Sequence, residues 1–187
     1  ETLFYMLSGM IDTLMLSSVS DQAVGAVGTA NTYIGVFIIM FGVISSGMVA
    51  VMTQNIGAGK TGVAYQARQL GLIFNTVVGV LLMSAFLAIF SGKILEIVSI
   101  APALLEPAET YLKIVGGACF LNALIPIFSS YLRVFGYTKQ SLFASIIGNV
   151  INFILNYVFL FVLNWGVMGV ATATVISRVI NLIMVAV

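Results

Sequence analysis

Long runs of apolar residues, separated by short polar segments, dominate this chain. An α-helix needs about 20 mainly apolar residues to cross the hydrocarbon core of a bilayer. We predict six spans, at residues 3–16, 33–52, 70–90, 111–132, 142–163 and 167–187. The runs are apolar on all sides, whereas barrel strands alternate in polarity, so we expect helices. The predicted fold class is therefore an all-α, polytopic transmembrane helix bundle.

The composition supports a membrane location. The chain is 61% hydrophobic and 7% charged, whereas soluble domains carry about 25% charged residues. The lipid bilayer is therefore an expected partner. No basic cluster is present, so nucleic acid is not an expected partner. The chain has no histidine, a single cysteine and no nucleotide-binding glycine loop, so we expect neither an enzyme nor a cofactor.

Both ends of the chain fall in or beside apolar runs. The sequence begins with Glu1 and ends at Val187 inside the last predicted span. We therefore expect a piece of a longer protein, in which span one is truncated at its start and span six is cut at its end.

The charges between the spans predict an orientation. The segments 57–68 and 133–140 hold four basic residues and no acid. The segments on the other side hold the acids and one lysine. These residues are Lys60, Arg68, Arg133 and Lys139 on the first side, and Asp21, Lys93, Glu96, Glu106 and Glu109 on the second. Because positive loops stay inside, we expect a multi-pass protein of the cell (plasma) membrane, with the chain start and the 57–68 and 133–140 loops in the cytoplasm.

Prolines predict two irregularities. The segment 94–110 contains Pro102 and Pro107, and we predict a surface loop with a short interfacial helix there. Pro126 lies inside the fourth span, where it frees a backbone carbonyl and is expected to kink the helix. Membrane helices tolerate such breaks, which can act as hinges.

Asp12 is the most informative single residue. Its neighbours in the first span are apolar or small. A carboxylate costs roughly 2.5–3.5 kcal/mol at a bilayer centre on insertion scales, and membrane proteins that keep one use it for cations, protons or a buried base. We therefore predict that Asp12 binds a coupling cation or proton.

A polar stripe follows one face of the fifth span. Ser145, Asn149, Asn152 and Asn156 lie four, three and four residues apart, which places them within about 60° of one another on a helix. One interpretation is that Asn152 and Asn156 meet Asp12 around a cation or a protonated carboxyl. The other is that the stripe joins helices by hydrogen bonds, worth about 0.6–2 kcal/mol each.

Further polar and aromatic residues are candidates for supporting roles. Thr174 in the sixth span is a candidate donor to Asp12 or ion ligand, although most membrane threonines bond their own backbone. Gln54 either caps the end of span two or, with Asn149, faces a substrate cavity. Arg178 is expected to snorkel to the headgroups. Tyr111, at a span end, is expected in an aromatic belt.

Several segments together resemble the multidrug and toxic compound extrusion (MATE) family of secondary transporters. The resemblance covers nearly the whole chain, and the order and spacing of the segments make it specific. The matching segments are Met10-Ile11-Asp12-Thr13-Leu14-Met15, residues 23–28, residues 51–59, Arg133-Val134-Phe135-Gly136-Tyr137-Thr138, residues 152–156 and residues 166–178.

The resemblance implies that residues 1–187 are the N-terminal six-span lobe of a twelve-span transporter. It implies an antiporter that exports organic cations and drugs in exchange for H⁺ or Na⁺, with the C-terminal lobe of the same protein as partner. The family's cation site maps onto Asp12, Asn152, Asn156 and Thr174. Asn156 stands where the family usually has an Asp, which leaves Asp12 as the single carboxylate and favours H⁺ over a Na⁺ held by Asp12, Asn152 and Asn156.

Other functions remain open at this stage. A flippase for lipid-linked oligosaccharides, from a related superfamily, would have similar spans. Its cavity is expected to carry basic residues, of which the spans here offer few. A non-transporting membrane subunit would use the polar stripe only to join helices. An intramembrane enzyme lacks a credible nucleophile and base.

Overall fold

The computed structural model describes residues 2–97 and 99–186, and this part of the chain is helical without strands. The predicted all-α helix bundle is confirmed. The elements are α1 (Thr2–Ser17), α2 (Asp21–Gly57), α3 (Thr61–Thr76), η1 (Val77–Ser84), α4 (Ala85–Ile97), α5 (Pro102–Tyr111), η2 (Leu112–Gly116), α6 (Cys119–Val134), α7 (Thr138–Tyr157), η3 (Val158–Val162) and α8 (Gly166–Ala186). The segments η1, η2 and η3 are π-helical.

The second span begins earlier than the apolar run predicted. Helix α2 has 37 residues and starts at Asp21, not near Tyr33. Ser20 caps it, because the Ser20 hydroxyl oxygen accepts a hydrogen bond from the backbone N–H of Ala23 at 3.3 Å. The first turns of α2 contain small and polar residues, so their hydropathy is lower than that of the rest of the helix, and the prediction left them out of the span. They are nonetheless packed, since Ala26 and Val27 are buried.

The segment predicted as a surface loop is mostly helical. Helix α4 continues to Ile97, and α5 begins at Pro102, which occupies the first helical position, where no N–H is required. Pro107 lies inside α5. Helix α5 packs against α2, α4 and α8, and its place at a membrane interface stays a prediction.

The fourth span is broken before it reaches Pro126. The run Pro102–Gly116 meets α6 at an angle of 41°, and the break falls at residues 117–118. Pro126 lies within the continuous helix α6. The kink at Pro126 stays a prediction, and the observed break lies earlier, where two consecutive small residues follow a π-helical turn.

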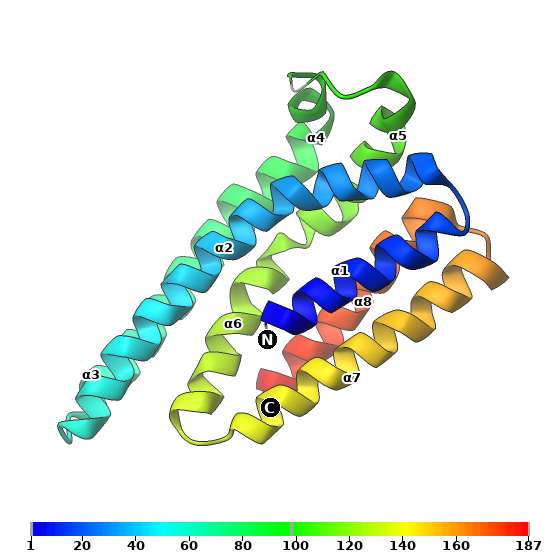
Figure 1. Ribbon diagram of the computed structural model, residues 1–187. Helices are drawn as coiled ribbons and strands as arrows, with labels where there is room; N and C mark the ends of the chain where they lie inside the picture. The colour runs from blue at the N-terminus through cyan, green and yellow to red at the C-terminus, as the bar shows by residue number, and fades with distance from the viewer. Residues whose placement is uncertain (1, 98, 187) are drawn as a thin grey trace.

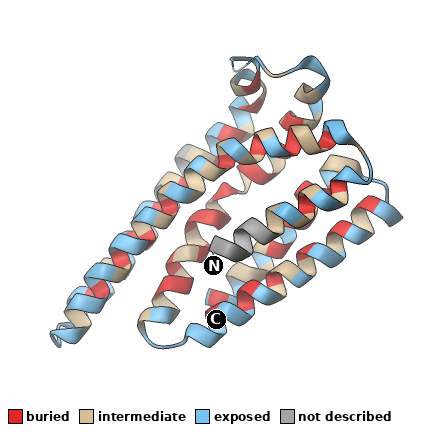
Figure 2. Cartoon of the chain, in the orientation of Figure 1, coloured by how far each residue is buried: buried red, intermediate tan, exposed pale blue. Residues whose placement is uncertain are grey.

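Helix α6 lies between the α2–α3 hairpin and α8. The hairpin of α2 and α3 extends to one end of the bundle, and α4 and α5 lie at the other (Figure 1). Helix α6 packs against α2, α3 and α8, while α1 packs against α7 and α7 against α8. Buried residues follow the inward faces of the helices, and the outward faces are exposed (Figure 2). This arrangement brings α1, α7 and α8 into mutual contact.

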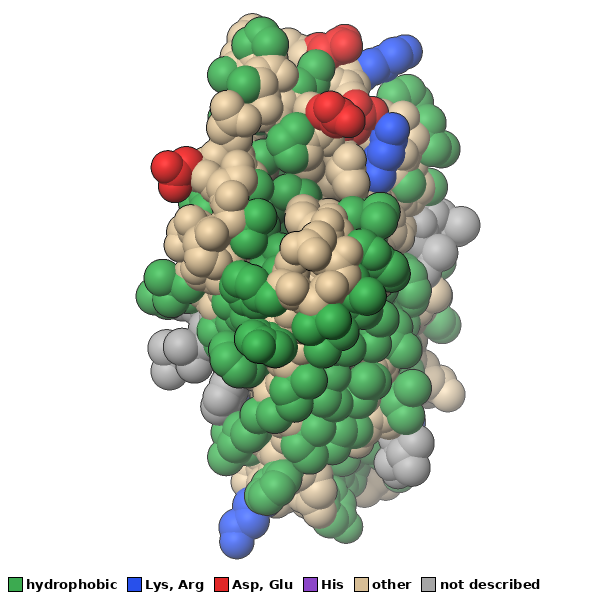
Figure 3. Space-filling model, turned by 90° about the vertical axis from the view of Figure 1, so that its right-hand side faces the viewer, with side chains coloured by type: hydrophobic (Ala, Val, Ile, Leu, Met, Phe, Trp, Pro, Cys, Tyr) green, Lys and Arg blue, Asp and Glu red, His purple; other side chains and the backbone are tan. Residues whose placement is uncertain are grey.

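The outer surface is that of a membrane protein. Within the described residues, α2, α7 with η3, and α8 are long and apolar enough to cross a membrane, and the bent α5–α6 pair makes a fourth such span. One side of the molecule shows apolar side chains over its middle and charged side chains at its two ends (Figure 3). The count of six spans stays a prediction for α1 and for the α3–α4 run.

Candidate cation site

Asp12 is buried at the contact of α1, α7 and α8. Its side chain is 1% exposed. Asn156 Nδ2 donates a hydrogen bond to Asp12 Oδ1 at 2.6 Å, and Thr174 Oγ1 donates to Asp12 Oδ2 at 3.0 Å. The positive charge of Arg178 on α8 also interacts electrostatically with Asp12. The carboxylate is therefore surrounded by neutral hydrogen-bond donors from two other helices, with the charge of Arg178 nearby.

Asn152 joins the same cluster one helical turn before Asn156. Asn152 Oδ1 accepts a hydrogen bond from Asn156 Nδ2 at 3.4 Å and another from Ser8 Oγ at 3.3 Å. Asn152 Nδ2 lies 3.5 Å from Thr174 Oγ1. The structure thus brings together Asp12, Asn152, Asn156 and Thr174, the four residues proposed from the sequence as a cation site.

The hydroxyl of Thr174 has two acceptors and one hydrogen. Besides Asp12 Oδ2, the backbone oxygen of Val170 lies 2.9 Å from Thr174 Oγ1. A hydroxyl can donate one hydrogen bond and accept two. Rotation about one bond therefore switches Thr174 between donating to Asp12 and accepting from it.

Asn156 orients its nitrogen, and not its oxygen, toward Asp12. The sequence had suggested that the carboxamide oxygens would face a shared cation. Asn156 Oδ1 is instead buried with no hydrogen-bond partner among the described residues. A half-turn of the amide would exchange the two atoms, so Asn156 can offer Asp12 either a donor or an acceptor.

Two residues near the cluster had been given surface roles from the sequence. Tyr111 was expected in an aromatic belt, but it is 1% exposed and lies beside Asn31 and Thr174. Arg178 was expected to snorkel to the headgroups. Its Nη1 instead donates to Asn122 Oδ1 on α6 at 2.6 Å, and Asn122 is buried. Arg178 follows Thr174 by one helical turn, a spacing that could have indicated this inward position.

The remaining sequence candidates lie outside the cluster. Ser145 is buried and donates to the backbone oxygen of Ser141 at 3.1 Å, so this part of the stripe bonds its own helix. Asn149 is half-buried on α7, and Gln54 is exposed near the end of α2. Their place in a substrate cavity stays a prediction.

The comparisons with known proteins establish the family. The family model MatE matches residues 1–158, and the chain belongs to this family. The uncharacterized transporter YisQ of Bacillus subtilis (strain 168) is 36% identical over 187 residues, covering 98% of this chain and 41% of YisQ. The probable multidrug resistance protein NorM of Thermotoga maritima is 29% identical over 197 residues, covering 97% of this chain and 40% of NorM.

Solved structures show the same fold. A structure described as MATE in the bent conformation superposes with a TM-score of 0.89 at 21% identity, over 98% of this chain and 41% of that one. An outward-facing multidrug resistance MATE family transporter superposes with a TM-score of 0.88 at 21% identity, over 99% of this chain and 41% of that one. The chain thus spans about two fifths of the length of the relatives that it matches.

Proposed function

We propose that residues 1–187 form the N-terminal lobe of a secondary antiporter that exports organic cations in exchange for H⁺ or Na⁺. In this proposal a C-terminal lobe of the same protein completes the transport path, and Asp12 carries the coupling cation. The family and the name of the NorM relative support the transport class. The observation that supports the coupling role is the buried carboxylate, held between helices by neutral hydrogen-bond donors and influenced by the charge of Arg178.

The hydrogen-bond geometry favours a proton over sodium. A proton on Asp12 Oδ2 can be donated to Thr174 Oγ1, while the Thr174 hydroxyl turns to the backbone oxygen of Val170. No heavy atom has to move. A Na⁺ ion beside Asp12 Oδ1 would first require the Asn156 amide to turn, because its nitrogen now lies 2.6 Å away. We therefore propose H⁺ in preference to Na⁺ as the coupling ion.

Neutralisation of Asp12 would change how three helices are held together. Charge-assisted hydrogen bonds are roughly twice as strong as neutral ones. The bonds from Asn156 on α7 and Thr174 on α8 to Asp12 on α1 therefore weaken when the carboxylate gains a proton. We propose that this loosened contact lets α1 shift against α7 and α8, and that two lobes rocking about a central cavity give alternating access.

The substrate and orientation parts of the proposal rest on the sequence. Gln54 and Asn149 are proposed to face the cavity between the lobes, where they would contact a small organic cation. The protein is proposed to lie in the plasma membrane with the chain start and the loops 57–68 and 133–140 in the cytoplasm, following the excess of basic residues there.

Ethidium accumulation tests the coupling role of Asp12. Cells without their own efflux pumps would express the full-length protein as wild type, Asp12→Asn or Asp21→Asn. The last variant removes the same charge at an exposed position. We expect low accumulation with wild type and Asp21→Asn and high accumulation with Asp12→Asn at equal expression. Export by Asp12→Asn at the wild-type rate would exclude Asp12 from coupling.

Everted membrane vesicles separate the two coupling ions. A pH gradient imposed in sodium-free buffer is expected to drive ethidium uptake in wild-type vesicles but not in Asp12→Asn vesicles. Uptake that requires a Na⁺ gradient, and is absent with the pH gradient alone, would contradict proton coupling and would support a Na⁺ site at Asp12, Asn152 and Asn156.

A further inference from the structure

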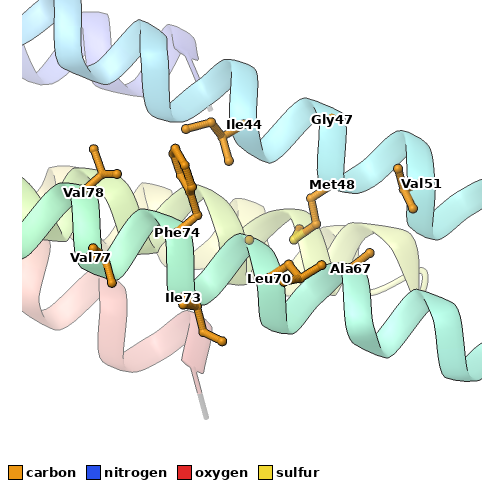
Figure 4. Close-up of a pocket in the computed structure, with 11 residues that line it drawn as sticks. Ile44, Gly47, Met48, Val51, Ala67, Leu70, Ile73, Phe74, Val77 and Val78 are labelled. Carbon is orange, nitrogen blue, oxygen red and sulfur yellow. The ribbon is translucent and has the colours of Figure 1, made fainter.

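A second site lies on the outer side of the α2–α3 hairpin, on helices that contribute none of the four residues of the cation cluster. A cavity of about 580 Å³ opens between α2 and the α3–η1 run. Its lining consists of apolar side chains and glycines (Figure 4). Several of the lining side chains are exposed, including Leu70 at 67% and Ile73 at 60%. We call this cavity the α2–α3 groove.

The length of the α2–α3 groove fits one extended hydrocarbon chain. On α3 and η1 the lining runs from Ala67 to Val78, which corresponds to about 16 Å at 1.5 Å per residue. One leaflet contributes about half of a hydrocarbon core that is ~30 Å thick.

Gly47 keeps the groove open on the α2 side. A Cβ atom added at Gly47 would meet nothing within 4 Å. Gly47 is exposed and lies between Ile44 and Val51 in the groove wall. The groove therefore has room at this position for a ligand atom or for a larger side chain.

Basic residues lie at one end of the groove. Ala67 lines that end, and Arg68 follows it on α3. The Arg68 guanidinium lies 4.2 Å from the centre of the Tyr131 ring, and its buried Nε has no hydrogen-bond partner among the described residues. Lys60 directly precedes α3 and is exposed. Residues 57–68 contain no acid, so this end carries unbalanced positive charge.

We propose that the α2–α3 groove binds one acyl chain of an anionic phospholipid, drawn from the leaflet at the basic end. The apolar lining holds the chain by contact, and Lys60 and Arg68 attract the phosphate headgroup. A basic residue near an anionic membrane surface strengthens such attraction. Charge complementarity selects an anionic over a zwitterionic headgroup.

The experiment uses the full-length protein purified in mild detergent. Native mass spectrometry would compare retention of phosphatidylglycerol and phosphatidylcholine with identical chains. Phosphatidylglycerol with a photoreactive diazirine in its acyl chain would then be cross-linked to wild-type protein and mapped by peptide sequencing. We expect preferential retention of phosphatidylglycerol and labelling within residues 44–51 and 67–78.

Two variant pairs make the test specific. Gly47→Leu fills the groove, whereas Gly42→Leu makes the same change on α2 outside the groove lining, also with no atom within 4 Å of the new Cβ. Arg68→Gln removes a charge beside the groove, and Lys139→Gln removes one at the start of α7. We expect at least a tenfold loss of acyl labelling with Gly47→Leu and loss of headgroup preference with Arg68→Gln, and neither effect in the controls.

Three results would overturn the proposal. The first is wild-type labelling confined to other helices, and the second is equal labelling in Gly47→Leu and Gly42→Leu. The third is cross-linking of groove residues to the second lobe in place of lipid. Lipid binding is measured without transport. The lipid result can therefore be interpreted even if the antiport proposal fails, and the transport result can be interpreted even if the lipid proposal fails.

Discussion

Replacing Asp12 by asparagine is predicted to abolish transport while leaving the stability of the lobe nearly unchanged. Asparagine has the same shape as aspartate but carries no charge. Its oxygen can accept from Asn156 Nδ2, and its nitrogen can donate to Thr174 Oγ1, whose own hydrogen then turns to the backbone oxygen of Val170. Each hydrogen-bond donor around the new side chain therefore meets an acceptor, and no buried donor faces another donor.

The expected magnitude follows from two opposing contributions. An ionised carboxylate at membrane depth costs about 2.5–3.5 kcal/mol on insertion scales, and asparagine removes that cost. A hydrogen bond to a charged group contributes about 1.5–3 kcal/mol and a neutral one about 0.5–1.5 kcal/mol, so two bonds favour the carboxylate by about 2–3 kcal/mol. The two contributions offset each other to within about 1 kcal/mol.

Asn156→Leu supplies the contrast. It leaves the carboxylate in place and removes the donor 2.6 Å from it, so we expect the free energy of unfolding to fall by about 1.5–3 kcal/mol. Thermal unfolding of the purified full-length protein at alkaline pH measures both variants, and 1 kcal/mol corresponds to less than the about 2–4 °C typical of 150–250 residues, because a longer chain has a larger unfolding entropy. A loss of more than about 2 kcal/mol in Asp12→Asn, or none in Asn156→Leu, would refute this account of the site.

Three further predictions concern other contacts. Thr174→Val is expected to reduce export at least tenfold at equal expression, whereas Thr174→Ser keeps the hydroxyl and is expected to keep most of the export activity. Equal export activity of the two variants would show that transport does not need the hydroxyl. Gly79→Ala places a Cβ 2.7 Å from a side chain of α6 and is expected to lower the free energy of unfolding by about 1–3 kcal/mol. In the control Gly42→Ala, the new Cβ meets no atom within 4 Å, so thermal unfolding is expected to show an unchanged or higher stability. Arg178→Gln removes the cation that donates to Asn122 at 2.6 Å and is expected to lower the free energy of unfolding by about 1.5–3 kcal/mol. If Arg178 reached the headgroups instead, the same substitution would change the free energy of unfolding little.

Spacing along single helices predicted much of the candidate site. Asn152 and Asn156 are one turn apart on one helix, so their common face followed from helical geometry alone. The cost of a carboxylate at membrane depth identified Asp12 without any knowledge of its neighbours. What spacing could not supply was the direction of each amide. The structure orients the Asn156 nitrogen to Asp12, because that carboxylate accepts hydrogen bonds.

Predictions that depended on hydropathy were less accurate. The start of α2 and the helix α5 contain small, polar or proline residues, so their hydropathy resembled that of loops. Burial against other helices stabilises them as helix all the same. Tyr111 and Arg178 were assigned to the membrane surface because their residue types are common there. Their real positions depend on which helices pack beside them.

The sequence by itself thus determined the class of fold, the membrane environment and the residues of one polar face, because these depend on composition and on the 3.6-residue period of a helix. Only the tertiary structure decided that α1, α7 and α8 meet at Asp12, that Arg178 lies against Asn122, and that a groove opens between α2 and α3. Those features join residues far apart in the chain, and only the packing of the helices brings them into contact.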